Sequence, residues 1–163
     1  MIVSLTGFMG SGKSRVGIEL ARRLGLRHVD LDRAVTQRTG KSVTEIFEAG
    51  ESAFRAVELE TLRVVLSRGA GDSFVLSLGG GTVATPEALE LVLAHTTSFY
   101  LKSSIESIRA RVGGNTSSRP LYADAEALLA SREPIYEKAA FTIVTDDKTP
   151  QMIADEIVAI LER

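Results

Sequence analysis

The sequence predicts an α/β fold, in which helices cover both faces of a parallel sheet. Short runs rich in β-branched and apolar residues, such as 2–5 and 74–78, are typical of strands buried on both faces. Segments with apolar residues at helical spacing alternate with these runs. A glycine-rich loop follows the first run, and in such sheets ligands bind where the strands end.

That first loop carries the clearest motif in the chain. Residues 7–14 read Gly-Phe-Met-Gly-Ser-Gly-Lys-Ser and match G-x-x-x-x-G-K-[ST] in full. The predicted strand 2–5 precedes the loop, and the predicted helix Lys13–Leu24 follows it with a single apolar stripe. The motif therefore has the strand–turn–helix setting of a phosphate-binding loop.

Each part of this loop has a role in binding a nucleoside triphosphate. Gly10, Ser11 and Gly12 belong to a turn whose backbone N–H groups can converge on phosphate oxygens, and the helix N-terminus adds partial positive charge. Lys13 is expected to reach the outer phosphates, and the Ser14 hydroxyl is expected to bind Mg²⁺.

Two aspartates follow the next predicted strand, 27–29. Asp30 and Asp32 would stand at the edge of the sheet where chemistry is expected. One carboxylate could hold Mg²⁺ or its waters, and the other could accept a proton or a hydrogen bond from a substrate hydroxyl. The alternative is that an aspartate caps the following helix, and Asp32 could do both.

The stretch between this strand and the next is predicted to be helical. One short helix closes at Gly40, a second opens with the capping box Ser42-x-x-Glu45, and a longer helix covers Glu51–Arg68. The strand 74–78 follows.

Gly79, Gly80 and Gly81 end that strand with three residues that lack side chains. Three glycines are entropically costly, so we expect backbone here to approach a ligand or another strand closely. A simple tight turn is the alternative.

The second half of the chain continues the alternation. The predicted elements are a helix over 86–94, a strand over 98–101, a helix over 103–111 opened by the capping box Ser103 to Glu106, a mobile loop over 112–124, a helix over 125–132, the strand Phe141–Val144 and a final helix from Pro150.

Of the arginines, Arg119 has the strongest claim to function from its position alone. It lies beside Pro120 in the predicted loop, and a loop arginine that closes over phosphates can neutralise charge during phosphoryl transfer. Arg55 could merely pair with Glu58 one turn on, and Arg132 is equally ambiguous. We expect His28 and His95 to be structural, and the pattern leaves Tyr122 and Tyr136 undecided.

Composition excludes several classes of protein. The chain has 163 residues, 44% of them hydrophobic, which suits one domain with a full core. A net charge of -2 argues against a general nucleic-acid binder, and the absence of cysteine excludes disulfides and thiolate chemistry. No apolar run reaches membrane-spanning length and no signal peptide precedes the first strand, so we expect a cytoplasmic protein, complete over 1–163. Without an exposed apolar stripe to spare, we expect a monomer.

The motifs taken together resemble those of the shikimate kinase family, nearly from end to end. The chain lacks the Asn-Lys-x-Asp element of GTPases, since its only asparagine, Asn115, precedes Thr116. The matching pieces are 7–14, Asp30-Leu31-Asp32, Ile46-Phe47, Phe54-Arg55-x-x-Glu58, Leu78-Gly79-Gly80-Gly81, Arg119-Pro120-Leu121 and Arg132-x-Pro134-x-Tyr136.

The resemblance implies a three-layer P-loop kinase with a five-stranded parallel sheet, a substrate-binding region over 32–60 and a lid over 112–124. It implies ATP-dependent phosphorylation of the shikimate 3-hydroxyl, with Mg²⁺, in the pathway to chorismate and the aromatic amino acids. The implied residue roles are Asp32 as base or orienter of the hydroxyl; Arg55 and Arg132 on the carboxylate; Gly79, Gly80 and Gly81 lining the substrate; Asp30 on Mg²⁺ through water; Arg119 on the phosphates; and Arg111 and Pro150 beside adenine.

Two alternatives stay open at this point. Another small polyhydroxy acid, gluconate being the obvious one, could be the acceptor of the same kind of kinase. A non-catalytic relative that senses a nucleotide or metabolite is the second alternative, although such a protein would be expected to lose Lys13, Asp32 or Arg119, and all three are present.

Overall fold

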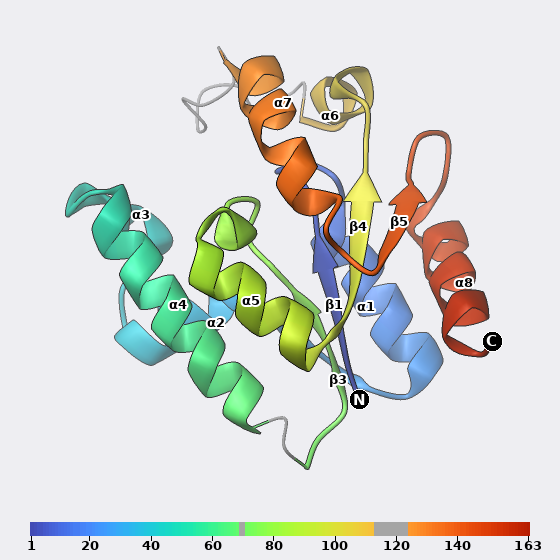
Figure 1. Cartoon of the computed structure of the whole chain (residues 1–163), viewed down its shortest axis with the longest axis horizontal. Coiled ribbons are helices and arrows are strands. Elements are labelled where there is room, and N and C mark those ends of the chain that lie inside the picture. The colour runs from blue at the N-terminus through green and yellow to red at the C-terminus, as the bar shows by residue number, and fades with distance from the viewer. Residues whose placement is uncertain (69–70, 113–123) are drawn as a thin grey trace.

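The computed structural model describes residues 1–68, 71–112 and 124–163, and it confirms a parallel sheet covered by helices. Its five strands are paired in the order β2-β3-β1-β4-β5, and every pairing is parallel. Figure 1 shows β4 between β1 and β5. The strands are β1 (Ile2–Thr6), β2 (Arg27–Asp30), β3 (Phe74–Ser77), β4 (Thr97–Lys102) and β5 (Phe141–Val144).

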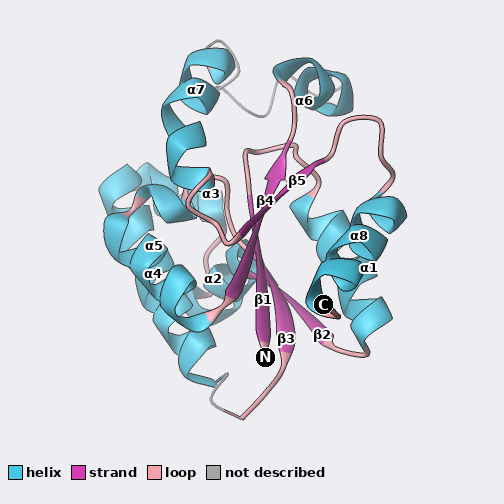
Figure 2. Ribbon diagram, turned by 45° about the vertical axis from the view of Figure 1, so that its right-hand side comes forward, coloured by secondary structure: helices cyan, strands magenta, loops and turns pink. Residues whose placement is uncertain are grey.

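Helices pack on both faces of this sheet, which gives the three-layer arrangement seen edge-on in Figure 2. On one face lie α1 (Lys13–Leu24) and α8 (Pro150–Leu161). The other described helices are α2 (Leu31–Thr39), α3 (Val43–Glu48), α4 (Glu51–Arg68), the short 3₁₀ helix η1 (Thr82–Ala84), α5 (Pro86–His95), α6 (Ile105–Val112) and α7 (Ala125–Tyr136).

The core follows from side-chain alternation along the strands. In β1, Val3 and Leu5 are fully buried against α1 and α8, whereas Ile2 joins the cluster that includes α4 and α5. Successive residues of a strand point to opposite faces, so an apolar strand supplies both cores at once. Among the described helices, none is long and apolar enough to cross a bilayer.

The helix α7 continues beyond the predicted end at residue 132, and it contains Pro134. A proline inside a helix removes one backbone hydrogen bond but keeps a helical φ. The side chain of Tyr136, which is buried and hydrogen-bonded, holds the last turn in place. Tertiary contacts therefore override the local signal that favoured an earlier end.

The predicted capping box of Ser103 and Glu106 is wrong. The helix α6 begins at Ile105, and the Ser104 hydroxyl accepts a hydrogen bond from the backbone N–H of Ser107 at 3.1 Å. Ser103 lies one residue too early for a cap, and its buried hydroxyl instead bonds Thr145 on the neighbouring strand's exit loop. The capping box of Ser42 and Glu45, by contrast, is confirmed.

Candidate active site

The loop between β1 and α1 wraps around the Lys13 side chain. Lys13 is 8% exposed, and its ammonium donates to the carbonyl oxygens of Gly7 at 2.7 Å and Phe8 at 2.9 Å. Gly12, which precedes the helix, has a φ of 89° and open space where a Cβ would stand. The loop therefore presents a glycine backbone, a helix N-terminus and a buried ammonium at one place, which suits a polyphosphate.

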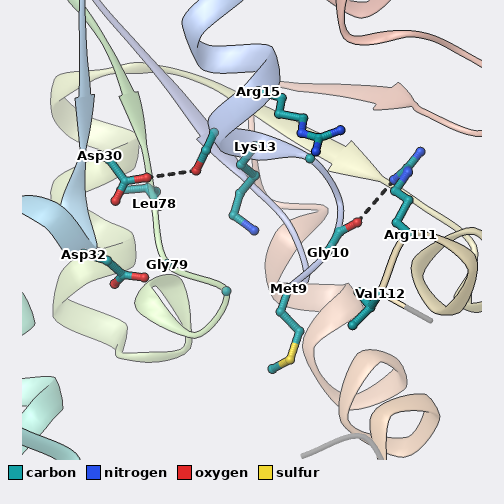
Figure 3. A pocket seen from close by; sticks show the side chains of 13 residues that line it. Met9, Gly10, Lys13, Arg15, Asp30, Asp32, Leu78, Gly79, Arg111 and Val112 are labelled. Carbon is teal, nitrogen blue, oxygen red and sulfur yellow. Dashed lines mark hydrogen bonds between the residues drawn. The ribbon is translucent and has the colours of Figure 1, made fainter. Parts of the chain in front are cut away.

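A cavity of about 590 Å³ opens beside this loop (Figure 3). It forms where β1, β2 and β3 end, because parallel strands bring their carboxyl ends to the same edge. The lining includes these residues singled out from the sequence: Gly10, Gly12, Lys13, Ser14, Asp30, Asp32, Gly79, Gly80 and Arg111. Met9, Arg15, Leu78 and Val112 complete the wall.

Ser14 and Asp30 face each other across the first turn of α1. The Ser14 hydroxyl donates to the Asp30 carboxylate at 2.9 Å, and the other carboxylate oxygen accepts from the backbone N–H of Arg33. Asp30, not Asp32, is thus the N-cap of α2, because it is the residue with extended backbone just before the helix.

This oxygen pair fits Mg²⁺, which takes oxygen ligands and is usually held by one or two protein groups together with substrate phosphates and waters. No cluster of three or more acidic, histidine or cysteine side chains suited to a metal occurs within residues 1–68, 71–112 and 124–163. A cation here would therefore depend on the nucleotide for most of its ligands.

Asp32 lies in the first turn of α2 and points into the same cavity. Burial raises the pKa of its carboxyl, as do the negative charges of Glu58 and Asp30, while Lys13 and Arg55 act in the opposite direction. A raised pKa brings a carboxylate closer to the range in which it can exchange a proton at neutral pH. Asp32 therefore has the electrostatic setting of a proton acceptor.

Next to Asp32, the helix α4 supplies a buried ion pair. Arg55 donates to the carboxylate of Glu58 at 2.8 Å, and the hydroxyl of Thr82 donates to the other oxygen of that carboxylate at 2.8 Å. Glu58 is 2% exposed, so both its oxygens need such partners. Arg55 also lies so close to Gly81 that a Cβ on Gly81 would collide with its guanidinium. The glycine thus makes room for the arginine.

Arg132 approaches the glycine turn from α7. It is half-buried, and its charge acts on the phenol of Tyr136, one helical turn further on. Burial raises the pKa of the Tyr136 phenol, while the positive charges of Arg132 and Arg55 act in the opposite direction. Arg55, from α4, is packed against Gly81, and Arg132 is one helical turn before Tyr136 on α7; neither arginine, nor Gly81, is part of the cavity wall.

Arg111 lies at the other end of the cavity. Its guanidinium donates to Ser103 at 3.1 Å and, at 3.4 Å, to the carbonyl oxygens of Gly10 and Thr145. It thereby joins the phosphate-binding loop, through the bond to Gly10 shown in Figure 3, to the loop after β5.

Some predicted site residues are not brought into the cavity wall. Ser11 is buried beneath the loop, where it accepts from Lys13, and Pro150 begins α8 without lining the cavity. Arg119 and most of the predicted lid lie outside the described residues. His28 is outside the wall as well, paired with the Ser77 hydroxyl at 2.9 Å, and burial lowers its pKa.

The sequence prediction gives no site role to several residues of this region, among them Glu58, Thr82 and Met9. Glu58 enters it only as a partner for Arg55 and as part of the family motif. Thr82 directly follows the glycine triplet, so its position in the sequence could have indicated that it lies near the site. The contact that gives it a role, with a helix 24 residues earlier, has no local pattern in the sequence.

Comparison with known proteins supplies the family. A family model described as shikimate kinase matches residues 9–162. The shikimate kinase of Thermus thermophilus is 42% identical over 99% of this chain and 90% of its own length.

Among solved structures, shikimate kinase from Acinetobacter baumannii in complex with shikimate superimposes with a TM-score of 0.91 at 30% identity, over 99% of this chain and 92% of that one. Shikimate kinase from Aquifex aeolicus superimposes with a TM-score of 0.87 at 34% identity, over 99% and 96%.

Proposed function

The chain belongs to the shikimate kinase family, a family of ATP-dependent kinases, and we propose how its residues divide the phosphorylation of the shikimate 3-hydroxyl between them. The observation that carries the assignment is the single cavity in which Lys13, Ser14 and Asp32 meet. One wall suits a triphosphate and the opposite side suits a small anionic polyol.

The nucleotide half of the reaction falls to the loop after β1. We assign the phosphates of ATP to the backbone of Gly10 and Gly12, with Lys13 exchanging its carbonyl partners for phosphate oxygens. Ser14 and, through water, Asp30 would hold Mg²⁺, which supplies charge neutralisation on the phosphates when bound. Arg111 would lie against adenine, with Pro150 on the other side of the base.

The acceptor half falls to α2, α4, α7 and the glycine turn. Arg55 and Arg132 would grip the shikimate carboxylate as planar guanidinium forks, and residues 79–81 would line the ring. Asp32 would hydrogen-bond the 3-hydroxyl and hold it in line with the γ-phosphorus. The region 32–60 thus acts as the substrate-binding part of one domain.

In the transfer step the hydroxyl oxygen bonds to the γ-phosphorus while the bond from that phosphorus to the β,γ-bridging oxygen breaks. The electron pair of the broken bond leaves with ADP, and the hydroxyl proton passes to the Asp32 carboxylate. Lys13 would stabilise the negative charge on the transferring γ-phosphoryl group and on the β-phosphate of the leaving ADP. We retain Arg119 as the proposed further cation on the phosphates and residues 112–124 as the proposed lid.

A coupled ADP-release assay tests this proposal directly. With ATP and Mg²⁺ we expect release that depends on shikimate and that Lys13→Ala nearly abolishes. Gluconate and a blank without acceptor are the controls. Release with gluconate but not with shikimate would keep the nucleotide half of the proposal and overturn the acceptor half.

A further inference from the structure

Tyr136 makes a contact that the steps proposed above do not use. Its side chain is 1% exposed at the end of α7, and its hydroxyl donates a hydrogen bond to the carbonyl oxygen of Gly80. Its ring packs on Tyr100 of β4 with ring centroids 5.1 Å apart. Packing therefore fixes the position of the ring. The hydrogen bond from its hydroxyl in turn fixes the position of the Gly80 carbonyl group.

Gly80 is confined from the opposite side as well. A Cβ on Gly80 would lie 3.1 Å from the backbone nitrogen of Met9 in the phosphate-binding loop. The next residue, Gly81, is packed directly against the Arg55 guanidinium. A shift of the Gly80 carbonyl would therefore disturb both the packing of the Arg55 guanidinium on Gly81 and the position of the Met9 backbone.

The same helix that carries Tyr136 also carries Arg132, one turn earlier. The hydrogen bond to Gly80 thus joins the helix of one arginine to the turn that supports the other. Planar guanidinium groups bind a carboxylate well only when their separation and orientation are held closely. In this fold, the distance between α7 and the glycine turn sets the separation and the relative orientation of the Arg55 and Arg132 guanidinium groups.

We propose that Tyr136 is a positioning residue for the acceptor, whose hydroxyl holds the glycine turn against α7 so that Arg55 and Arg132 can grip a single carboxylate. This role rests on the proposed function only for the identity of the acceptor. The alternative is that Tyr136 merely anchors α7 to the sheet and contributes to stability alone.

The substitution Tyr136→Phe tests the role, because it removes the hydroxyl and keeps the ring in its packing. We expect the KM for shikimate to rise about tenfold, as for loss of one buried hydrogen bond, and the KM for ATP to change less than about twofold. Tyr100→Phe is the matched control: it removes a phenol oxygen from the ring beside Tyr136, and its hydroxyl has no hydrogen-bond partner within the described residues. It should leave both constants unchanged.

Amide hydrogen exchange supplies a readout that does not depend on the acceptor. Peptides that contain Gly80 and Gly81 should exchange faster in Tyr136→Phe than in the wild type or in Tyr100→Phe. Unchanged exchange, or a shikimate KM equal to that of the control, would overturn the positioning role. An equal rise in both KM values, with a lower melting temperature, would assign Tyr136 to stability alone. A wild type that neither binds nor phosphorylates shikimate would instead overturn the proposed function, and the exchange comparison would still decide the role of Tyr136.

Discussion

Asp32 has a setting that few surface carboxylates share. Burial and two neighbouring carboxylates raise its pKa, while Lys13 and Arg55 keep it within reach of ionisation. For a group that accepts a proton in the transition state, a pKa suited to proton transfer matters more than the strength with which the group binds the substrate.

Asp32→Asn should therefore lower kcat by about 10²–10⁴-fold while raising the KM for shikimate much less, because the amide can still hydrogen-bond the hydroxyl but cannot take its proton. Steady-state kinetics with ATP in excess measure the split. Asp72→Asn is the control, since Asp72 pairs with Arg27 and does not line the cavity. A kcat close to that of the wild type would show that phosphoryl transfer does not require Asp32 as a base.

Two buried threonines offer a matched test of hydrogen-bond energetics. The Thr82 hydroxyl is bonded to the buried Glu58 carboxylate, whereas the Thr6 hydroxyl is buried without a hydrogen-bond partner among the described residues. Replacing Thr82 by valine leaves a carboxylate oxygen short of a donor, and replacing Thr6 by valine removes an unsatisfied polar group.

Thr82→Val should accordingly lower the free energy of unfolding by about 1–3 kcal/mol, and Thr6→Val should leave it unchanged or raise it. Urea denaturation of the two variants and the wild type measures the difference. Equal destabilisation by both substitutions would contradict this account of the Glu58 site.

At the scale of elements, the sequence was most informative where the signals are local. The bounds of α1 and α4 agree with the prediction, since each helix has buried apolar residues at helical spacing along its own length, and Gly25 caps the end of α1. The start of α6 does not agree, because two adjacent serines compete for the cap. Buried contacts with Thr145, 42 residues away, take Ser103 out of the competition.

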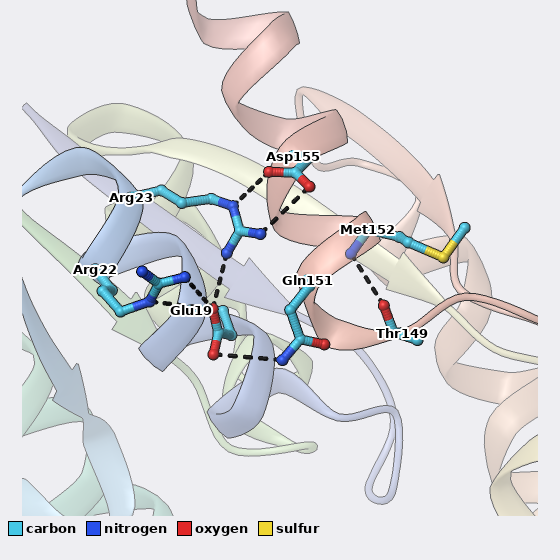
Figure 4. A network of polar contacts seen from close by, with 7 residues as sticks. All are labelled: Glu19, Arg22, Arg23, Thr149, Gln151, Met152 and Asp155. Atoms are coloured by element: carbon cyan, nitrogen blue, oxygen red, sulfur yellow. Dashed lines mark hydrogen bonds and ion pairs between the residues drawn. The ribbon is translucent and has the colours of Figure 1, made fainter.

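The packing of α1 against α8 is reinforced by a network of charged side chains (Figure 4). Arg23 bonds Glu19 on its own helix and Asp155 on α8, and Gln151 of α8 reaches Glu19 at 3.4 Å. Hydrogen bonding to Arg23 holds the pKa of Asp155 below its usual range, and bonding to Arg22 does the same for Glu19. The two arginines therefore favour the ionised form of both acids.

The sign of the pH dependence follows. A carboxyl whose pKa is lower in the folded state than in the unfolded chain stabilises the fold above the unfolded pKa, and this contribution is lost as the pH falls through the folded pKa. Arg23→Gln should therefore lower the melting temperature slightly at pH 7, by less in high salt, and not at all in strong acid. Arg15→Gln is the control on the same helix, since Arg15 has no ion pair among the described residues. A difference that persists in acid would indicate packing rather than charge.

At the scale of the whole molecule, the fold could be predicted because each strand and helix has its own sequence pattern. The phosphate side of the site could be predicted for the same reason, since Lys13 and Ser14 begin the helix after the glycine loop and Asp30 ends β2. The acceptor side could not be built in the same way. Its contacts join residues that are distant in the chain, such as Tyr136 and Gly80, which are 56 residues apart. A single sequence has no local pattern from which such pairs can be predicted.

Ligand binding should stabilise the whole molecule if the cavity holds what we propose. ATP with Mg²⁺ at about 100 times its Kd should add about 2.7 kcal/mol, which corresponds to a rise of roughly 5–10 °C in the melting temperature. Adding EDTA should remove most of that rise, because Ser14 and Asp30 would then face the phosphates without a cation. Thermal denaturation in each condition measures it, with Lys13→Ala as the variant that should not respond. An equal rise in melting temperature with and without EDTA would contradict the proposal that Ser14 and Asp30 hold a metal ion.

The glycine turn after β3 has a consequence for changing the acceptor by design. The side chains that would contact the acceptor come from helices, and these can be exchanged without touching the nucleotide loop. The turn itself cannot, because Gly80 lies against the backbone of Met9 and Gly81 lies against Arg55. A library aimed at a new polyol should therefore vary positions on α2, α4 and α7 and leave all three glycines fixed. A side chain at Gly80 would press on the nucleotide loop, whereas one at Gly79 or Gly81 would displace Asp32, Glu58 or Arg55 on the acceptor side.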